Sequence, residues 1–426
     1  SLCWMLLYFK MRFNSSADKT WMNCYKFWVK IFALSFALGI VSGITMSFQF
    51  GTNWPGFMEM VGNVAGPLLA YEVMTAFFLE ATFLGIMLFG SERVSNRVHT
   101  ISTFLVCIGT SASAFWILTL NSWMQTPSGI EMVDGKAIVT DWFEVIFNPS
   151  MPYRIIHMSL ASILTACFLI AGVSSYQLLC NNKFKPAKYA IKAALIIAAI
   201  VTPVQIIVGD IHGLNTVKYQ PAKIAAIEAV WNTKKGVPLV LFAWPNEITK
   251  TNNFVIEIPK LASLILTHDF DGKIKGINDF EHAPPVKPLF FGFRIMVGIG
   301  ILMLLASCYG VYIIFRDQRY GTRFLQFLYW MSFSGWVATL AGWYVTEIGR
   351  QPYLVQGILK TADAVSEVPP ENIALSLIGY LVTYLILIII YIRTVFYLAS
   401  QAVDKYNIIE SDIYIKPAFN SVIKYT

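Results

Sequence analysis

Two glutamates, Glu72 and Glu80, stand inside an apolar run from Ala65 to Phe89 that is long enough to cross a membrane. A carboxylate is costly at bilayer depth, and the chains that keep one there use it for function. Eight residues of helix separate the two by about 12 Å along the axis and leave them on roughly one face. They therefore predict a two-step path for protons, a metal centre or a substrate site. The alternative is an interhelical pair that only fixes packing.

A second candidate site combines His157 with Met296. His157 begins an apolar span, and Met296, within Phe293-Arg294-Ile295-Met296, begins another that enters from the same membrane face. Histidine and methionine together form the axial ligand pair of low-spin haems of raised potential, and Arg294 can pair a haem propionate. The alternative is a satisfied polar histidine and a methionine that only packs. The other histidines are expected at a cytoplasmic boundary (His99) or in an outer loop (His212, His268, His282).

The segment from Gly342 to Tyr353 closes another span with charged and aromatic residues. Glu347 and Arg350 are three residues apart, so a plain ion pair at a helix end explains the two charges. It does not explain why two aromatic residues gather at the same place.

One outer connection contains Lys223 and Glu228, five residues apart and followed by Trp231. A solvated helix face accounts for such a pair. The alternative is a site for a quinol head group, which needs hydrogen-bond partners for its hydroxyls and an aromatic wall.

Composition determines the class of protein. Of 426 residues, 56% are hydrophobic and 13% are charged, whereas soluble domains carry about 25% charged residues. The sequence therefore predicts an all-α polytopic membrane protein. The six cysteines include no CxxC pair, and the net charge of +7 is explained by basic loops on one membrane face, so no nucleic-acid partner is expected.

The order of spans and loops predicts the domain organisation. A partial first helix is followed by eight apolar segments, at 31–50, 65–90, 98–120, 155–179, 189–209, 289–315, 324–346 and 373–399. Basic residues gather in every second connection, which places those connections in the cytoplasm. We expect helices 1 (partial) to 6 in residues 1–209, an outer quinol-binding loop at 210–288, helices 7 to 9 at 289–400 and a cytoplasmic tail at 401–426.

Several motifs resemble subunit I of cytochrome bd-type quinol oxidases, in the order of that family and over nearly the whole chain. They are Phe48 to Trp54, Glu72 with Ala76 to Glu80, Phe293 to Met296 and Trp343 to Pro352. The resemblance implies a terminal oxidase of the bacterial inner membrane that oxidises quinol, reduces dioxygen to water and generates a proton gradient without pumping.

The resemblance also implies haem cofactors. His157 and Met296 are similar to the ligands of a low-spin haem b, and Glu347 to a ligand of one of two oxygen-side haems, a high-spin haem b and a haem d or further haem b. Arg294 and Arg350 resemble arginines near haem propionates, and Trp343 belongs to the cofactor-binding motif. The family histidine that ligates an oxygen-side haem from the first helix is expected before residue 1.

The remaining roles that the resemblance implies concern protons and quinol. Glu80 and then Glu72 resemble steps of a proton path from the cytoplasm, and Ser113 and Asn121 resemble polar positions near it. Lys223 and Glu228 resemble the lysine and the glutamate that take part in quinol oxidation in this family. The short outer loop resembles the short-loop branch, which includes cyanide-insensitive oxidases.

The expected partners are subunit II, small single-helix subunits, ubiquinol or menaquinol, dioxygen and the lipid bilayer. Two other classes of protein stay open from the residues alone. One is a quinone-reactive haem anchor of a dehydrogenase, although that class places several histidines inside its helices. The other is an ion-coupled transporter using Glu72 and Glu80.

Overall fold

A computed structural model describes residues 1–365 and 367–422, with the side chains up to Ile408. Its long helices are α1 (Leu2–Ser16), α2 (Lys19–Thr52), α3 (Pro55–Glu72), α4 (Phe78–Phe89), α5 (Asn96–Gln125), α7 (Met151–Cys180), α8 (Lys185–Tyr219), α11 (Val286–Phe315), α13 (Ser334–Ile348) and α14 (Pro370–Val422). The shorter ones are α6 (Trp142–Ile146), α9 (Pro221–Ile227), α10 (Leu261–Thr267) and α12 (Thr322–Trp330). A π-helix at Val73–Phe77 joins α3 to α4. The predicted all-α polytopic class is therefore confirmed.

Seven helices in the described part of the chain are long and apolar enough to cross a membrane, α3 and α4 counting as one. They match seven of the eight predicted apolar segments. The eighth, 324–346, is divided into α12 and α13 by a 3-10 turn at Met331–Phe333. This turn lies against α7 at Gly172, where an added Cβ would approach the Cα of Ser332 to 2.7 Å. The close approach of the two backbones requires a glycine there, a common device between membrane helices.

Local sequence explains where the helices begin. Asp18 accepts a hydrogen bond from the backbone N–H of Thr20, and Ser95 accepts one from that of Val98. Both side chains thereby satisfy an N–H group that the first helical turn leaves free. Proline stands in the first turn of α3, α7, α8 and α9, where its missing N–H costs nothing.

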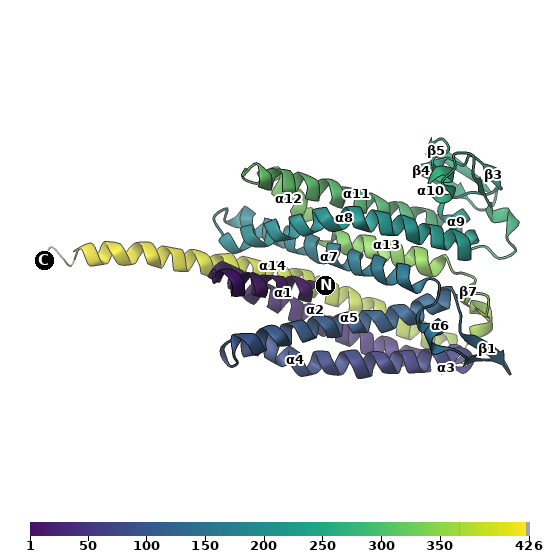
Figure 1. Ribbon diagram of the computed structural model, residues 1–426, viewed down its shortest axis with the longest axis horizontal. Helices are drawn as coiled ribbons and strands as arrows, with labels where there is room; N and C mark the ends of the chain where they lie inside the picture. Colours follow the sequence, from purple (N-terminus) through teal and green to yellow (C-terminus); the bar gives the residue numbers. More distant parts are fainter. Residues whose placement is uncertain (366, 423–426) are drawn as a thin grey trace.

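The connections separate into two ends of the bundle, as the loop charges predict. Figure 1 shows the α4–α5, α7–α8 and α11–α12 connections at one end, and the short strands with α9 and α10 at the other. The first set contains the basic loops at 91–97, 180–188 and 316–323. The end with the strands therefore faces outward.

The core is formed by helices that approach closely through small residues. Along α7 and α8, Ala171, Gly172, Ala190 and Ala194 are fully or almost fully buried. In contrast, the most apolar stretch of α14 has no buried residue. A helix with so much exposed apolar surface is suited to contact lipid or another membrane subunit.

The outer segment is a small layer of helices and two-stranded sheets. Antiparallel pairs join β4 (Leu239–Asn246) with β5 (Thr251–Ile258) and β3 (Lys234–Lys235) with β6 (Lys273–Ile274). Two further pairs lie elsewhere at this end, β1 (Ile130–Val133) with β2 (Lys136–Val139) and β7 (Tyr353–Val355) with β8 (Leu359–Lys360).

The predicted domain limits differ from the helix ends. α8 continues to Tyr219, so the outer segment begins about three helical turns after the predicted limit at 210. α14 continues through most of the predicted tail 401–426, of which residues 423–426 lie outside the described residues.

Candidate functional site

A buried polar cluster surrounds Glu347 near the outer end of α13. The Glu347 carboxylate accepts a hydrogen bond from Asn121 Nδ2 at 2.8 Å and forms an ion pair with Arg350. Arg154, one turn before His157 on α7, donates to Asn121 Oδ1. Arg350 thus contacts the Glu347 carboxylate directly, and Arg154 is connected to it through Asn121. The Nε of Arg154 and both the Nε and Nη1 of Arg350 are buried without a hydrogen-bond partner among the described residues.

The surplus of positive charge makes this cluster a suitable site for an anionic group. Guanidinium N–H groups form strong, often paired hydrogen bonds with carboxylates, and a haem carries two propionates. Arg350 is a predicted member of the site. Arg154 was not, although an arginine close to His157 within a predominantly apolar helix is a signal that the sequence contains.

The predicted ligand His157 lies at an interface between α7 and α8. Its Nε2 is 3.2 Å from Gln205 Nε2, and its Nδ1 is buried without a partner among the described residues. Gly209 of α8 faces the ring, and an added Cβ there would lie 3.3 Å from His157 Cε1. The imidazole therefore has a free ring nitrogen and a small neighbour, both of which suit a ligand to haem iron.

The placement of His212 corrects the sequence analysis. We expected it in the outer loop, but α8 extends past it and its ring lies 5.6 Å from that of His157, centroid to centroid. His157 is therefore not the only histidine within the helices at this depth.

The predicted second ligand, Met296, lies on α11 opposite α13. A Cβ added at Gly342 would approach Met296 Sδ to 2.9 Å. The glycine thus keeps space around the thioether, and the half-buried Trp343 follows it on the same helix. The donor set of one imidazole and one thioether, each beside a glycine, fits haem iron.

Lys223 lies in the wall of a cavity at the outer end of the bundle. Its Nζ donates to Gln125 Oε1 and to Gln220 Oε1, both at 2.7 Å. Burial, together with the nearby charges of Arg154 and Arg350, holds the pKa of Lys223 well below its usual range. The amine of Lys223 therefore loses its proton more easily than that of an exposed lysine. The neutral amine has a lone pair, which can accept a proton from a bound ligand.

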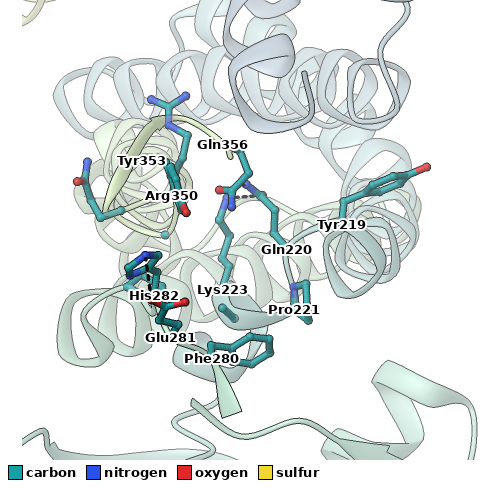
Figure 2. Close-up of a pocket in the computed structure, with 14 residues that line it drawn as sticks. Tyr219, Gln220, Pro221, Lys223, Phe280, Glu281, His282, Arg350, Tyr353 and Gln356 are labelled. Carbon is teal, nitrogen blue, oxygen red and sulfur yellow. Dashed lines mark hydrogen bonds and ion pairs between the residues drawn. The ribbon is translucent and has the colours of Figure 1, made fainter. Parts of the chain in front are cut away.

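The cavity has a volume of about 260 Å³. Figure 2 shows Lys223 near its centre, with His282 and Arg350 on one side and Gln220 and Tyr219 on the other. Gly349 contributes to the wall beside Lys223, where an added Cβ would meet Lys223 Cε at 2.7 Å. Because Arg350 also binds Glu347, the cavity and the Glu347 cluster have a side chain in common.

Glu228, the other predicted quinol-site residue, faces a separate hollow with Trp231 and Val240. Its carboxylate forms a buried ion pair with Arg294 Nη2 at 2.8 Å. The same guanidinium donates to the carbonyl oxygens of Val240 and Ile227. Lys223 and Glu228 are therefore not brought together in one cavity.

These contacts give Arg294 a different environment from the one that the sequence suggested. Its N–H groups are directed to the outer segment, and the guanidinium lies 3.9 Å from the ring centroid of Phe290. A contact with a haem propionate stays a prediction, and it would have to compete with these bonds.

The two membrane glutamates both face α5. Glu72 accepts a hydrogen bond from Ser113 Oγ at 2.7 Å. Glu80 is buried, and its Cγ would lie 2.6 Å from a Cβ added at Gly109. Gly109 and Ser113 are one helical turn apart, so the two carboxylates contact adjacent turns of one helix. The structure thus brings together Glu72, Glu80 and Ser113, while Asn121 belongs to the Glu347 cluster.

Comparison with known proteins shows that the chain is similar to one family over most of its length. The family described as cytochrome bd terminal oxidase subunit I matches residues 1–403. A Bacillus subtilis protein, cytochrome bd ubiquinol oxidase subunit 1, is 34% identical over 385 residues, which cover 87% of this chain and 82% of the relative. The cytochrome bd-II ubiquinol oxidase subunit 1 of Escherichia coli is 31% identical over 437 residues, covering 85% of each chain. The bd oxidase structure from Geobacillus thermodenitrificans superposes with a TM-score of 0.87 at 28% identity and covers 94% of this chain and 93% of its own.

Proposed function

This chain belongs to the family of cytochrome bd terminal oxidase subunit I, and from that premise we propose which of its residues perform the reaction. It is a multi-pass inner-membrane subunit of a quinol oxidase, and it acts with haem cofactors, quinol and dioxygen in a complex with other subunits. Haem iron, when bound, accepts electrons and supplies the centre at which dioxygen is reduced.

His157 and Met296 would hold a low-spin haem b, and Glu347 would ligate one of two oxygen-side haems. The free ring nitrogen of His157 and the glycine beside Met296 support the first assignment. The unpaired N–H groups of Arg154 and Arg350 support a propionate near the Glu347 cluster. The oxygen-side pair would be a high-spin haem b with a haem d or a further haem b.

One observation carries the assignment of quinol oxidation to the outer cavity. Arg350 lines this cavity with Lys223 and is also ion-paired to Glu347. Quinol in the cavity would therefore lie beside residues that hold the haem groups. Lys223 would receive a hydrogen bond or a proton from the head group, and Glu228 would support the site through Arg294.

Glu80 and Glu72 would conduct protons inward from the cytoplasm, with Ser113 orienting the Glu72 carboxylate. Quinol oxidation would release protons at the outer face, and oxygen reduction would take up protons from the cytoplasm. The two reactions together would separate charge across the membrane without a pump. Asn121 would orient Glu347, to which it donates a hydrogen bond.

The finer partners that we propose are subunit II, small single-helix subunits, and ubiquinol or menaquinol. The exposed apolar surface of α14 supports a contact with lipid or with another subunit.

Two measurements on the purified complex test the proposal. A visible spectrum of the reduced protein identifies the haem types, and a low-spin haem b signal lost in His157→Ala is expected. Lys223→Ala is expected to lose oxidation of a quinol analogue while keeping activity with an artificial electron donor. If Lys223→Ala oxidises quinol at the wild-type rate, the cavity is not the quinol site.

A further inference from the structure

The outer cavity is also lined by a histidine, His282, to which no role has been assigned above. Besides Lys223 of α9, it is lined by Glu281 and His282, which lie shortly before α11, and by Tyr353 of β7. Figure 2 shows His282 to one side of Lys223, with the Phe280 ring below Lys223. Polar groups therefore approach the cavity from two separate segments of the chain, with aromatic rings nearby.

Neighbouring side chains hold His282 in place but leave one of its ring nitrogens without a hydrogen bond from the described residues. Its Nε2 lies 3.1 Å from Lys360 Nζ and 4.0 Å from Glu281 Oε1, and its ring meets Tyr353 edge to face at 6.0 Å. The second ring nitrogen, Nδ1, makes no hydrogen bond within the described part of the chain. The imidazole is 35% exposed, so it connects the cavity with solvent.

A quinol head group has two oxygens on opposite sides of one ring, so it requires two polar partners that face each other. Lys223 can serve one oxygen only. Nδ1 of His282 can form a hydrogen bond with the other oxygen in either tautomer. A protonated Nδ1 donates to a quinone carbonyl, and a deprotonated Nδ1 accepts from a quinol hydroxyl.

We propose that His282 is the second partner of the quinol head group, opposite Lys223, and that it passes a quinol proton outward. This inference rests on the proposed function of the cavity. Oxidation breaks the two O–H bonds of the quinol and yields quinone, two protons and two electrons. The electrons go to the haem groups, which the family reaction supplies as oxidant. One proton goes to Lys223 and the other to His282.

Glu281 and Lys360 give the His282 proton a route outward. In the tautomer that carries its proton on Nε2, Nδ1 is free to take the quinol proton, and the imidazolium that forms is attracted to the Glu281 carboxylate, 4.0 Å from Nε2, and repelled by Lys360. The Glu281 side chain is 90% exposed, so a proton that reaches it is released to water at the outer face.

The test compares two histidines of the outer segment, each changed to asparagine in the assembled complex. In His282→Asn, kcat/KM for a soluble quinol analogue should fall about a hundredfold, because the amide can form a hydrogen bond but cannot take the quinol proton. Activity with an artificial electron donor and the haem spectrum should stay unchanged. The matched control is His268→Asn, because His268 is exposed, lies outside the cavity and has a φ of 57° that asparagine tolerates.

A measurement on the unaltered complex keeps the proposal testable if the variant fails to assemble. A quinol analogue that fills the cavity should slow the modification of His282 by diethyl pyrocarbonate and leave that of His268 unchanged. Unprotected His282, or normal quinol kinetics in His282→Asn while Lys223→Ala is inactive, would overturn this inference and leave the proposed quinol site standing. Normal quinol kinetics in Lys223→Ala would instead overturn the site itself.

Discussion

The buried pair of Arg294 and Glu228 makes a strong prediction about what holds the outer segment to the membrane helices. The two side chains are 17% and 6% exposed. The change Arg294→Met keeps an apolar stem but leaves the Glu228 carboxylate buried without a counter-charge. Such a loss costs about 3–5 kcal/mol. The variant also loses the hydrogen bonds to the carbonyl oxygens of Val240 and Ile227.

This cost falls on the outer segment, which can open without unfolding the membrane helices. Limited proteolysis of the purified complex should therefore cleave residues 228–258 more than about a hundredfold faster in Arg294→Met, the ratio that 3 kcal/mol gives. Lys260→Met is the matched control, since the Lys260–Asp271 pair has 51% and 68% exposed side chains. An exposed pair of this kind contributes about 0–1 kcal/mol.

A double change separates the unpaired charge from the lost packing. Arg294→Met combined with Glu228→Met removes both charges, so most of the resistance to proteolysis should return. The reasoning is refuted if Arg294→Met is cleaved no faster than Lys260→Met. If Arg294→Met also shifts the low-spin haem spectrum, Arg294 contacts a propionate, as the sequence resemblance implied.

The other predictions concern the haem pocket and the proton path. Met296→Leu keeps the apolar volume but removes the sulfur ligand, so the reduced visible spectrum should lose its low-spin signal; an unchanged spectrum would exclude Met296 as a ligand. Gly342→Ala adds a methyl group 2.9 Å from that sulfur and should weaken the same signal, whereas Gly300→Ala, with nothing within 4 Å, should not. Glu80→Gln should slow oxygen consumption with the low-spin haem intact, and Glu72→Gln should also disturb the oxygen-side haem spectrum. Full turnover in Glu80→Gln would leave both glutamates with a packing role only.

The membrane helices were predictable because lipid demands long apolar segments, but the end of α8 was not. Gly209, Asp210 and Gly213 have low helix propensity, so residues from 210 onward resemble a loop in sequence. Packing against α7 overrides this preference and carries the helix on to Tyr219. His212 was assigned to the loop for the same reason, and its neighbour across the interface could not be known.

Partners distant in sequence were also beyond prediction. The Phe293-to-Met296 motif identifies Arg294, but nothing local shows that its guanidinium binds Glu228 and two carbonyls of the outer segment. The 3-10 turn at Met331–Phe333 likewise depends on Gly172, which lies far away in the sequence. By contrast, Glu347 with Arg350 and the basic loops are local patterns, and the structure has them where the sequence suggests.

The π-helix at Val73–Phe77 has a consequence for the angular phase of the helix that carries both glutamates. In an uninterrupted α-helix, the eight residues from Glu72 to Glu80 turn through about 800°, which leaves the two side chains about 80° apart. A single π-turn absorbs about one extra residue, so the same eight residues turn through about 700°, within about 20° of two full revolutions. One inserted residue thus acts as a phase correction that sets the two carboxylates almost in line along the helix axis, whereas uninterrupted α-helical spacing would leave them about 80° apart.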